Sequence, residues 1–500
     1  MKNNLDVLFV SVGGTRKKVY QELSKDFSAV DTPFWAAMAA GFIRNNDFSV
    51  NILDANAENL DIIETAKRVE WLNPMFTAIV VYSQQANVCT PIMVAVGQLC
   101  REIKNLNPNI KVILTGWHPS ALPERTLTEE ECDFVAVGEG FYTLLGLLRK
   151  DPLTEIPGLW WKSNGRILHN ARANNVENMD MELSDIAWDL LPLDDGKYRA
   201  FSWMCLQDLE SRNRFVSMFT SLGCPFKCSF CAIHATYGER RIRYWSTGWV
   251  LEQLDILINM YKVKNINLID ELFIFNREHY IPIAQGVVER GYDLNFCAFA
   301  RVDVVNKIPD DDLVLLKKAG FNWFKLGIES SSSKILKKVS KGRFDKEIVR
   351  NVVKKIHKAG IDICANFMFG LPGDTWDTMQ ENLDFALELQ CSFPSFFCTM
   401  AIPGSDLYEE ALSKGIPVPD TWLGYATQGY DFFPLPTEDL TSAEVVSFRD
   451  YAFDTYFKNP RYLSMIKGKF GLKAREHIED MTRVKLKRKI LKNEVKSMIC

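Results

Sequence analysis

Short apolar segments alternate with amphipathic segments over the first 150 residues of the chain. The apolar segments are residues 6–12, 48–55, 76–83, 110–116 and 132–138, and helical patterns occupy residues 33–46, 90–106 and 140–149. Strands that alternate with helices predict βαβ units and a parallel sheet. The pattern therefore predicts a doubly wound, Rossmann-like domain over residues 1–150, with its ligand at the carboxyl ends of the strands.

The same alternation resumes at about residue 214. Residues 151–213 predict a hairpin, with its turn at Asn164-Gly165, and then a connector rich in Pro and Asp. The later strand segments are residues 215–222, 265–270, 294–301, 322–329, 362–370 and 395–401, with helical patterns such as 247–261, 277–290 and 345–358 between them. Six βα repeats predict a partial parallel (β/α)6 barrel over residues 214–401, with its chemistry at the carboxyl ends of the strands. The fold class is α/β, and we expect residues 402–500, which are mixed and mainly helical, to cover the substrate site.

The charge and the apolar segments of the chain argue against some classes of function. The chain has 59 basic and 63 acidic residues among its 500, a net charge of −4, which argues against a dedicated nucleic-acid-binding protein. No apolar segment reaches about 18 residues, so we expect no transmembrane helix, and the N-terminus lacks the pattern of a signal peptide. We therefore expect a cytoplasmic protein. The basic final forty residues favour a solvated helical face, although a membrane-surface or acidic-substrate contact stays open.

Three cysteines stand close together in the segment TSLGCPFKCSFCAIH, at Cys224, Cys228 and Cys231. In a reducing compartment such a group indicates metal binding or catalysis before disulfides. The spacing is not that of a structural zinc site, which needs four ligands that usually come as C-x-x-C pairs. Iron–sulfur clusters are normally bound by four thiolates, so three would leave one iron open for substrate chemistry. The alternative is three ordinary buried cysteines.

The cysteine segment CPFKCSFC, with the aromatic Phe230 before its last cysteine, resembles the signature of the radical S-adenosylmethionine (SAM) enzymes. Five further segments resemble motifs of that family and follow in the family's order: LIDELFIFN (268–276), FARVDVV (299–305), LGIESSSSKILKKVSKG (326–342), FMFGLPGDT (367–375) and IPGSDLYEEA (402–411). The similarity covers about 190 residues. One departure is that many members carry G-G-E after the second strand, where this chain has Asp270-Glu271.

The resemblance implies a [4Fe-4S] cluster ligated by Cys224, Cys228 and Cys231, with SAM on its open iron. An electron from a donor such as flavodoxin or ferredoxin then cleaves SAM to methionine and a 5′-deoxyadenosyl radical. The residues that the resemblance assigns to SAM are Asp270, Glu271, Arg301, Glu329, Ser330, Gly370, Leu371 and Gly373. Which of the two neighbouring carboxylates accepts hydrogen bonds from the SAM ammonium stays open. The alternative for Arg301 and Glu329 is a buried ion pair inside the barrel.

A doubly wound domain before such a barrel resembles the cobalamin-dependent branch of the family. The segments VDTPFWAAMAAGFIRNNDFSVNILDA (30–55) and TGWHPSALPE (115–124) carry this weaker similarity. The chain lacks the D-x-H-x-x-G motif, so the resemblance implies base-off cobalamin without a histidine ligand. The expected corrin contacts are Ser83, Gln84, Gly116, His118 and Gly138; His118 fits a loop residue near the corrin better than a cobalt ligand.

The resemblance implies a methyltransferase that uses cobalamin as its methyl carrier and acts on an unactivated carbon of a small-molecule biosynthetic intermediate. One alternative is an oxidative cyclase or ring-rearranging enzyme of the same architecture, without methyl transfer. Another is a non-catalytic corrinoid or iron–sulfur sensor. A third, the methylthiotransferase arrangement, would need a second cluster on Cys89, Cys100 and Cys132, which fit small buried side chains better.

Overall fold

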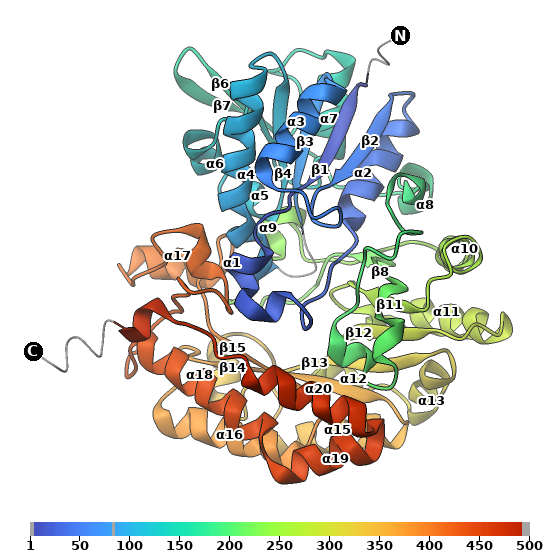
Figure 1. Ribbon diagram of the computed structural model, residues 1–500, viewed down its shortest axis with the longest axis vertical. Helices are drawn as coiled ribbons and strands as arrows, with labels where there is room; N and C mark the ends of the chain where they lie inside the picture. Colours follow the sequence, from blue (N-terminus) through green and yellow to red (C-terminus); the bar gives the residue numbers. More distant parts are fainter. Residues whose placement is uncertain (1–4, 83–85, 493–500) are drawn as a thin grey trace, which may run out of the picture.

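The computed structural model describes residues 5–82 and 86–492, and its two large sheets lie one above the other in Figure 1. The first sheet has the order β2-β1-β3-β4-β5-β6-β7, and β1 to β5 are parallel. These five strands are β1 (Val7–Ser11), β2 (Val50–Asp54), β3 (Phe76–Val81), β4 (Lys111–Gly116) and β5 (Phe134–Ala136). The helices between them include α2 (Phe34–Arg44), α3 (Ile62–Leu72) and α4 (Ala86–Leu106), and α7 (Phe141–Arg149) follows β5. The doubly wound fold is confirmed, and its strand order reverses between β1 and β3.

The predicted hairpin is present as β6 (Leu159–Ser163) and β7 (Arg166–His169). It does not stand apart in a connector, because β6 pairs antiparallel with β5 and extends the first sheet by two strands. Trp161 pairs with Phe134 in this extension and is buried, which explains why an apolar hairpin joins the sheet edge.

The second sheet has the order β15-β14-β13-β12-β11-β8 and is parallel throughout. Its strands are β8 (Phe215–Met218), β11 (Asn265–Leu268), β12 (Asn295–Arg301), β13 (Phe321–Glu329), β14 (Asp362–Phe369) and β15 (Phe393–Cys398). The helices α10 (Thr247–Asn259), α11 (Arg277–Glu289), α13 (Asp310–Lys318), α15 (Lys346–Lys358) and α16 (Trp376–Leu389) alternate with them. Because β8 and β15 are the two edges of this sheet, the barrel is partial, as predicted.

The first barrel strand is shorter than the sequence pattern predicts. It ends at Met218, and Ser221 and Leu222 form a separate strand, β9, that pairs with β10 (Arg243–Tyr244). The chain leaves the sheet because the carboxylate of Asp270, at the end of the neighbouring strand, accepts the backbone N–H and the hydroxyl of Thr220. These bonds replace the ladder bonds that a continuing strand would make.

The C-terminal region is mainly helical and consists of α17 (Asp406–Ser413), the 3-10 turn η6 (Trp422–Tyr425), α18 (Ser442–Phe457), α19 (Pro460–Phe470) and α20 (Leu472–Arg483). A capping box at Thr441 and Glu444 begins α18, which packs against β15 beside the open edge of the barrel (Figure 1). No helix in the described part of the chain is both long and apolar enough to cross a membrane.

The two sheets share one continuous hydrophobic core. Polar contacts fix their relative placement: Thr32 exchanges two hydrogen bonds of 2.9 Å with the backbone of Ser217 in β8. A buried ion pair joins Glu139, at the end of the first sheet, to Arg243 of β10. The carboxyl ends of β1 and β3 thereby face the barrel.

Candidate active site

The cysteine loop leaves the barrel directly after β9 and ends at the short helix α9 (His234–Tyr237). Its first residue, Gly223, has φ +102°, and a Cβ there would lie 2.3 Å from the backbone oxygen of Arg241. Only glycine allows the loop to start at this point. Along the loop Cys224 and Cys228 are partly buried, and Cys231 is exposed.

Backbone hydrogen bonds hold the centre of this loop from two sides. Ser229 donates its N–H to the oxygen of Val339 over 3.0 Å, and Leu407 donates to the oxygen of Ser229 over 2.9 Å. Phe230 packs against the hydrophobic groups that contain Leu371 and Leu407, so the aromatic of the signature anchors the loop. The loop's shape therefore depends on the motifs at the ends of β13, β14 and β15.

The donor set of this loop fits an iron–sulfur cluster. Within the described residues no three His, Cys, Asp or Glu side chains gather closely enough for a single metal ion. Cluster ligands are spread over different irons, and three cysteine side chains on one loop are the kind of donor that an iron–sulfur cluster takes.

Arg301, at the end of β12, lies against the cysteine loop. Its Nη1 donates to Cys228 Sγ over 3.2 Å, and its Nε and Nη2 donate to Asp303 over 3.0 Å each. The guanidinium also lies 3.7 Å from the ring centre of Phe226. The ion-pair alternative holds in another form: Arg301 and Glu329 do not pair with each other, but Arg301 pairs with Asp303 and Glu329 with Lys341.

The two acidic residues after β11, Asp270 and Glu271, lie in different environments. Asp270 is fully buried and accepts hydrogen bonds from Thr220 and Ser221, and burial raises its pKa to about 6. Glu271 accepts a bond from the Gly223 N–H over 3.3 Å, at the start of the cysteine loop. Burial, and then the charge of Asp270, raise the pKa of Glu271 well above its usual range. A cation bound at Glu271 would reverse that shift.

Glu329 ends β13 in a strained conformation, with φ +61°. Its carboxylate forms a buried ion pair with Lys341, with Oε1 and Nζ 2.5 Å apart, and its backbone oxygen accepts from Asn382 Nδ2 over 3.0 Å. Ser330 follows it and is also buried. Strain of this kind in a non-glycine residue is found where the surroundings fix one conformation, often at a binding site.

The turn after β14 contains two of the predicted SAM-contact glycines. Gly370 has φ +76° and faces Val445 of α18, because a Cβ there would lie 2.7 Å from the Val445 side chain. Gly373 has φ +87° and donates its N–H to Glu438 Oε2 over 3.0 Å. Between them Leu371 is buried and donates its N–H to Asp374.

A crevice lies at the carboxyl ends of β1 and β3, where the order of the first sheet reverses. Its volume is about 110 Å³, and its wall includes Ser11, Trp35 and Tyr82 from the first domain and Phe219 and Ile269 from the barrel. The Trp35 and Tyr82 rings stack with their centres 4.1 Å apart. Sequence patterns did not single out this aromatic pair, although it closes the position that doubly wound folds use for ligands.

The predicted corrin contacts have different surroundings. Gly116 has φ +118° and adjoins the backbone of Val81, whereas Gly138 has φ +99° and adjoins Arg172. His118 is buried, lies 3.3 Å from the Thr90 hydroxyl and contacts the ring of Trp422; burial lowers its pKa to about 3. Ser83 and Gln84 lie outside the described residues.

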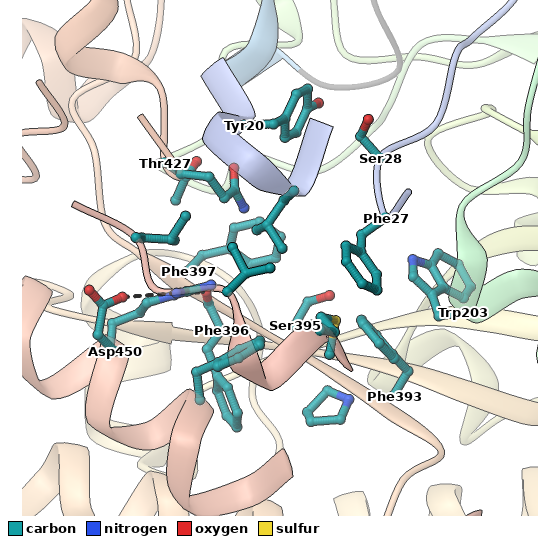
Figure 2. A pocket seen from close by; sticks show the side chains of 18 of the residues that line it. Tyr20, Phe27, Ser28, Trp203, Phe393, Ser395, Phe396, Phe397, Thr427 and Asp450 are labelled. Atoms are coloured by element: carbon teal, nitrogen blue, oxygen red, sulfur yellow. Dashed lines mark hydrogen bonds and ion pairs between the residues drawn. The ribbon is translucent and has the colours of Figure 1, made fainter. Parts of the chain in front are cut away.

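A second cavity of about 490 Å³ lies inside the open side of the barrel. Figure 2 shows its aromatic wall, with Phe27, Trp203, Phe393 and Phe397 around the space. It shares four wall residues with the crevice: Val19, Tyr20, Val88 and Phe201. A ligand at the first sheet and a ligand inside the barrel would therefore be neighbours.

Family comparisons match both halves of this arrangement. The description Radical SAM superfamily matches residues 218–386, and B12 binding domain matches residues 28–148. The chain belongs to the radical SAM enzymes that carry a B12-binding domain. A [4Fe-4S] cluster, SAM and cobalamin are accordingly its cofactors.

Relatives of this radical SAM enzyme include an uncharacterized methyltransferase of Pyrococcus horikoshii, 29% identical over 437 residues, 86% of this chain and 89% of that one. An anaerobic magnesium-protoporphyrin IX monomethyl ester cyclase of Rubrivivax gelatinosus is 23% identical and covers 76% of this chain and 66% of its own. A hopanoid C-2 methylase of Rhodopseudomonas palustris is 26% identical over 40% of this chain and 38% of its own length.

Solved structures share the fold of this radical SAM enzyme. The cobalamin-dependent enzyme OxsB, with aqua-cobalamin and SAM bound, superposes with a TM-score of 0.68 at 17% identity, over 95% of this chain and 72% of that one. The methyltransferase TsrM of Kitasatospora setae, with cobalamin and a [4Fe-4S] cluster bound, has a TM-score of 0.65 at 16% identity, over 82% and 75% of the two chains. The predicted order of a cobalamin-binding domain before a radical SAM barrel is confirmed.

Proposed function

We propose that the protein is a cobalamin-dependent radical SAM methyltransferase that methylates an unactivated carbon of a small molecule. One observation carries the proposal: the crevice of the B12-binding domain and the cavity of the barrel share a wall at Val19, Tyr20, Val88 and Phe201. Methyl transfer needs its carrier and its acceptor to be neighbours, and this arrangement provides that. The names of several relatives, including the P. horikoshii methyltransferase, agree with it.

The cluster would be bound by Cys224, Cys228 and Cys231. When bound, the cluster, SAM and cobalamin supply reductive cleavage of SAM, hydrogen abstraction from carbon and methyl transfer. The protein places these cofactors next to one another and excludes water from the site. Arg301 orients the Cys228 thiolate by its hydrogen bond, and Asp303 orients Arg301.

Glu271 is the carboxylate that we assign to the SAM ammonium. Asp270 already accepts the Thr220 N–H and the Thr220 and Ser221 hydroxyls, which occupy its oxygens, whereas Glu271 has one weak bond at the entrance to the cysteine loop. A bound ammonium would give the Glu271 carboxylate a charge-assisted partner and stabilise its ionised form. Glu329 and Ser330, at the end of β13, would contact the ribose.

The crevice residues would contact one part of the corrin. Trp35 and Tyr82 form an apolar aromatic surface on the side of the B12-binding domain. Phe219 and Ile269 close the crevice on the side of the barrel. Since His118 is buried beneath Trp422 and stays neutral, it acts as a packing residue in this proposal and not as a cobalt ligand. A low-potential flavodoxin or ferredoxin in the cytoplasm would be the electron donor.

Cofactor content and SAM turnover test the proposal together. The protein is purified without oxygen from cells supplied with cobalamin, and corrinoid, iron and sulfide are measured in one sample. We expect roughly one corrinoid and four irons per chain. With SAM and a chemical reductant, the same sample should form 5′-deoxyadenosine and S-adenosylhomocysteine. Iron without corrinoid would overturn the methyl-transfer proposal and leave the barrel's chemistry intact.

The cyclase relative of R. gelatinosus makes oxidation without methyl transfer the second candidate. Product mass separates the two reactions, because methylation adds about 14 Da whereas oxidation removes hydrogen or adds oxygen. Formation of 5′-deoxyadenosine without S-adenosylhomocysteine would favour the cyclase.

A further inference from the structure

We infer that an acidic electron-carrier protein docks on a basic hollow beside the cysteine loop. Five residues line this basic hollow: Lys227, Lys337, Ser340, Gly342 and Arg343. The inference rests on the proposed function, because it names the surface at which the cluster would receive its electron. Three observations support it: the charge of the hollow, its attachment to the cysteine loop, and the hydrogen bonds that join its edge to a cysteine.

The basic hollow has a positive charge at the protein surface. Lys227, Lys337 and Arg343 are exposed, and none of the three forms an ion pair within the described part of the chain. The residues that line the hollow include no carboxylate. Because the whole chain has a net charge of −4, an acidic partner gains nothing from the overall charge of the molecule. Three unpaired cations therefore give such a partner a preferred place to approach.

The carboxylates near the hollow do not cancel this charge. Residues 334–347, which form one side of the hollow, contain six basic and two acidic residues. Both acidic residues stand at the start of α15, where Asp345 caps the helix. Asp303 adjoins the hollow beside Gly342, and it is paired with Arg301. The net charge around the hollow is therefore positive.

The two sides of the hollow are joined at the cysteine loop. Lys227 belongs to this loop and stands in the sequence between its first two cysteines. The other lining residues lie at the end of α14 (Ser333–Lys338) and in the turn that follows it. That turn is held on the loop, because Ser229 donates its N–H to the oxygen of Val339 over 3.0 Å. A protein seated in the hollow would thus contact the loop that holds the cluster.

Two hydrogen bonds of Arg301 connect the edge of the hollow to a cysteine. Its Nη2 donates to the backbone oxygen of Lys341, which precedes Gly342 of the hollow, and its Nη1 donates to Cys228 Sγ over 3.2 Å. Electron transfer becomes much slower as distance grows, so a carrier has to come close to the cluster. At the hollow a single side chain separates the protein surface from a thiolate that would ligate the cluster.

An exposed aromatic ring lies next to the same part of the loop. The ring of Phe226, the residue before Lys227, lies 6.0 Å from the ring of Phe275, and Phe275 is 43% exposed. Protein interfaces commonly combine an apolar, often aromatic, centre with a polar rim. The exposed Phe275 ring and the neighbouring cations provide both kinds of surface.

The proposed step moves one electron and no proton. Flavodoxin in its hydroquinone form, FMNH⁻, loses one electron and becomes the neutral semiquinone, while the cluster passes from [4Fe-4S]²⁺ to [4Fe-4S]⁺. Attraction between an acidic carrier and the basic hollow would speed their encounter, and salt would screen it.

The first test measures how tightly the cofactor-loaded protein binds an oxidised flavodoxin of strongly negative net charge. Calorimetry at low and at high salt gives the Kd, which should rise with salt for the wild-type protein. At low salt, Lys337→Glu and Arg343→Glu should each raise the Kd about fivefold or more. Lys318→Glu is the matched control, because it makes the same change of charge at an exposed lysine just before β13 begins, at the opposite end of the strand from the loop. Its Kd should stay close to that of the wild-type protein.

The second test measures the rate of cluster reduction by stopped-flow spectroscopy. Reduced flavodoxin should reduce Lys337→Glu and Arg343→Glu more slowly than the wild-type protein, by about the same factor as the change in Kd. Reduced methyl viologen is a small cation, so it should reduce both variants at least as fast as the wild-type protein. Cleavage of SAM with this chemical reductant should be unchanged, since neither side chain contacts the cysteines.

A wild-type Kd that does not depend on salt would overturn the inference, and this measurement does not depend on the folding of any variant. An equal loss of affinity in Lys318→Glu would also overturn it, because the effect would then come from overall charge. Corrinoid content and S-adenosylhomocysteine formation report on the proposed function separately. Protein that lacks corrinoid but binds flavodoxin through Lys337 and Arg343 would contradict methyl transfer and leave the docking surface standing.

Discussion

The Arg301 guanidinium donates a hydrogen bond to Cys228 Sγ over 3.2 Å while Asp303 accepts from its other side. A positive donor at a cluster sulfur stabilises the more negative, reduced state of the cluster. Arg301→Gln should therefore lower the midpoint potential by about 60 mV, the shift that 1.4 kcal/mol produces in a one-electron couple. Redox titration followed by electron paramagnetic resonance measures it.

Arg350→Gln is the matched control for this shift, because Arg350 is a half-exposed arginine of α15 that pairs with Glu388 away from the cysteine loop. Its potential should equal that of the wild-type protein. An Arg301→Gln variant with normal iron content and an unchanged potential would show that the hydrogen bond does not tune the cluster.

The cysteine loop and the buried cysteines of the first domain should respond differently to substitution. Cys228→Ala removes a thiolate of the loop, so iron should fall from about four per chain to near background. Cys100→Ala and Cys132→Ala should keep their iron, because both side chains are buried in the hydrophobic core of the first domain and take no part in the cysteine loop. Iron lost in those two variants as well would point to a second cluster.

Substitution of Glu271 should weaken SAM binding, whereas substitution of Asp270 should lower folding stability. Glu271→Gln removes the charge offered to the SAM ammonium, so the Kd for SAM should rise at least about tenfold with little change in Tm. Calorimetry on the reconstituted protein measures this. Glu278→Gln, an exposed change nearby, should leave the Kd unaltered.

Asp270→Asn should act in the opposite way. It weakens the bonds to Thr220 and Ser221 that turn the chain out of the sheet, which costs about 2 kcal/mol of folding stability. If Asp270→Asn raised the Kd for SAM while Glu271→Gln did not, the roles of the two carboxylates would have to be exchanged.

The carboxyl group of Asp54, at the end of β2, should make the free energy of unfolding depend on pH. It is 1% exposed, accepts a hydrogen bond from Tyr198, and burial raises its pKa from 3.8 to about 6. A carboxyl with a raised folded-state pKa binds its proton more tightly when folded, so its stabilisation is complete below pH 3.8 and is lost as the pH rises through 6. Relative to Asp54→Asn, the wild-type protein should lose up to about 3 kcal/mol between pH 4 and 7.

Denaturant unfolding of both proteins at several pH values measures this difference. Asp293→Asn, whose side chain is 91% exposed, is the control and should show no such pH-dependent difference. A difference between the wild-type protein and Asp54→Asn that stays constant from pH 4 to 7 would mean that the Asp54 pKa is not raised.

Local sequence patterns predicted the elements that depend on neighbouring residues. The third barrel strand, predicted at 294–301, runs over Asn295–Arg301, and the cysteine motif was readable because all its members lie within one loop. The end of the first barrel strand was missed, since it depends on Asp270 some fifty positions later. A strand pattern gives no sign of a distant carboxylate that replaces its ladder bonds.

The contacts that surround the motifs are harder to predict from the sequence than the motifs themselves. The sequence assigned Arg301 to SAM, but its contact with Cys228 follows from tertiary packing of β12 against the loop. Lys325 stands in the apolar segment NWFKLGIE, which predicts a strand and gives no sign of a cavity. Its place in a cavity emerges only when β13, β14 and β15 are assembled beside residues from both ends of the described chain.

The two backbone bonds at Ser229 also set an order of maturation. Their partners, Val339 and Leu407, lie more than one hundred positions later in the chain, so the loop acquires its shape only after the second half of the barrel has folded. Contacts of such long range form late, because the intervening chain must first be ordered. Iron delivered earlier would meet a segment without fixed geometry. Cluster insertion is thus coupled to completion of the barrel, and the loop can receive its iron only in a chain whose second half is already folded.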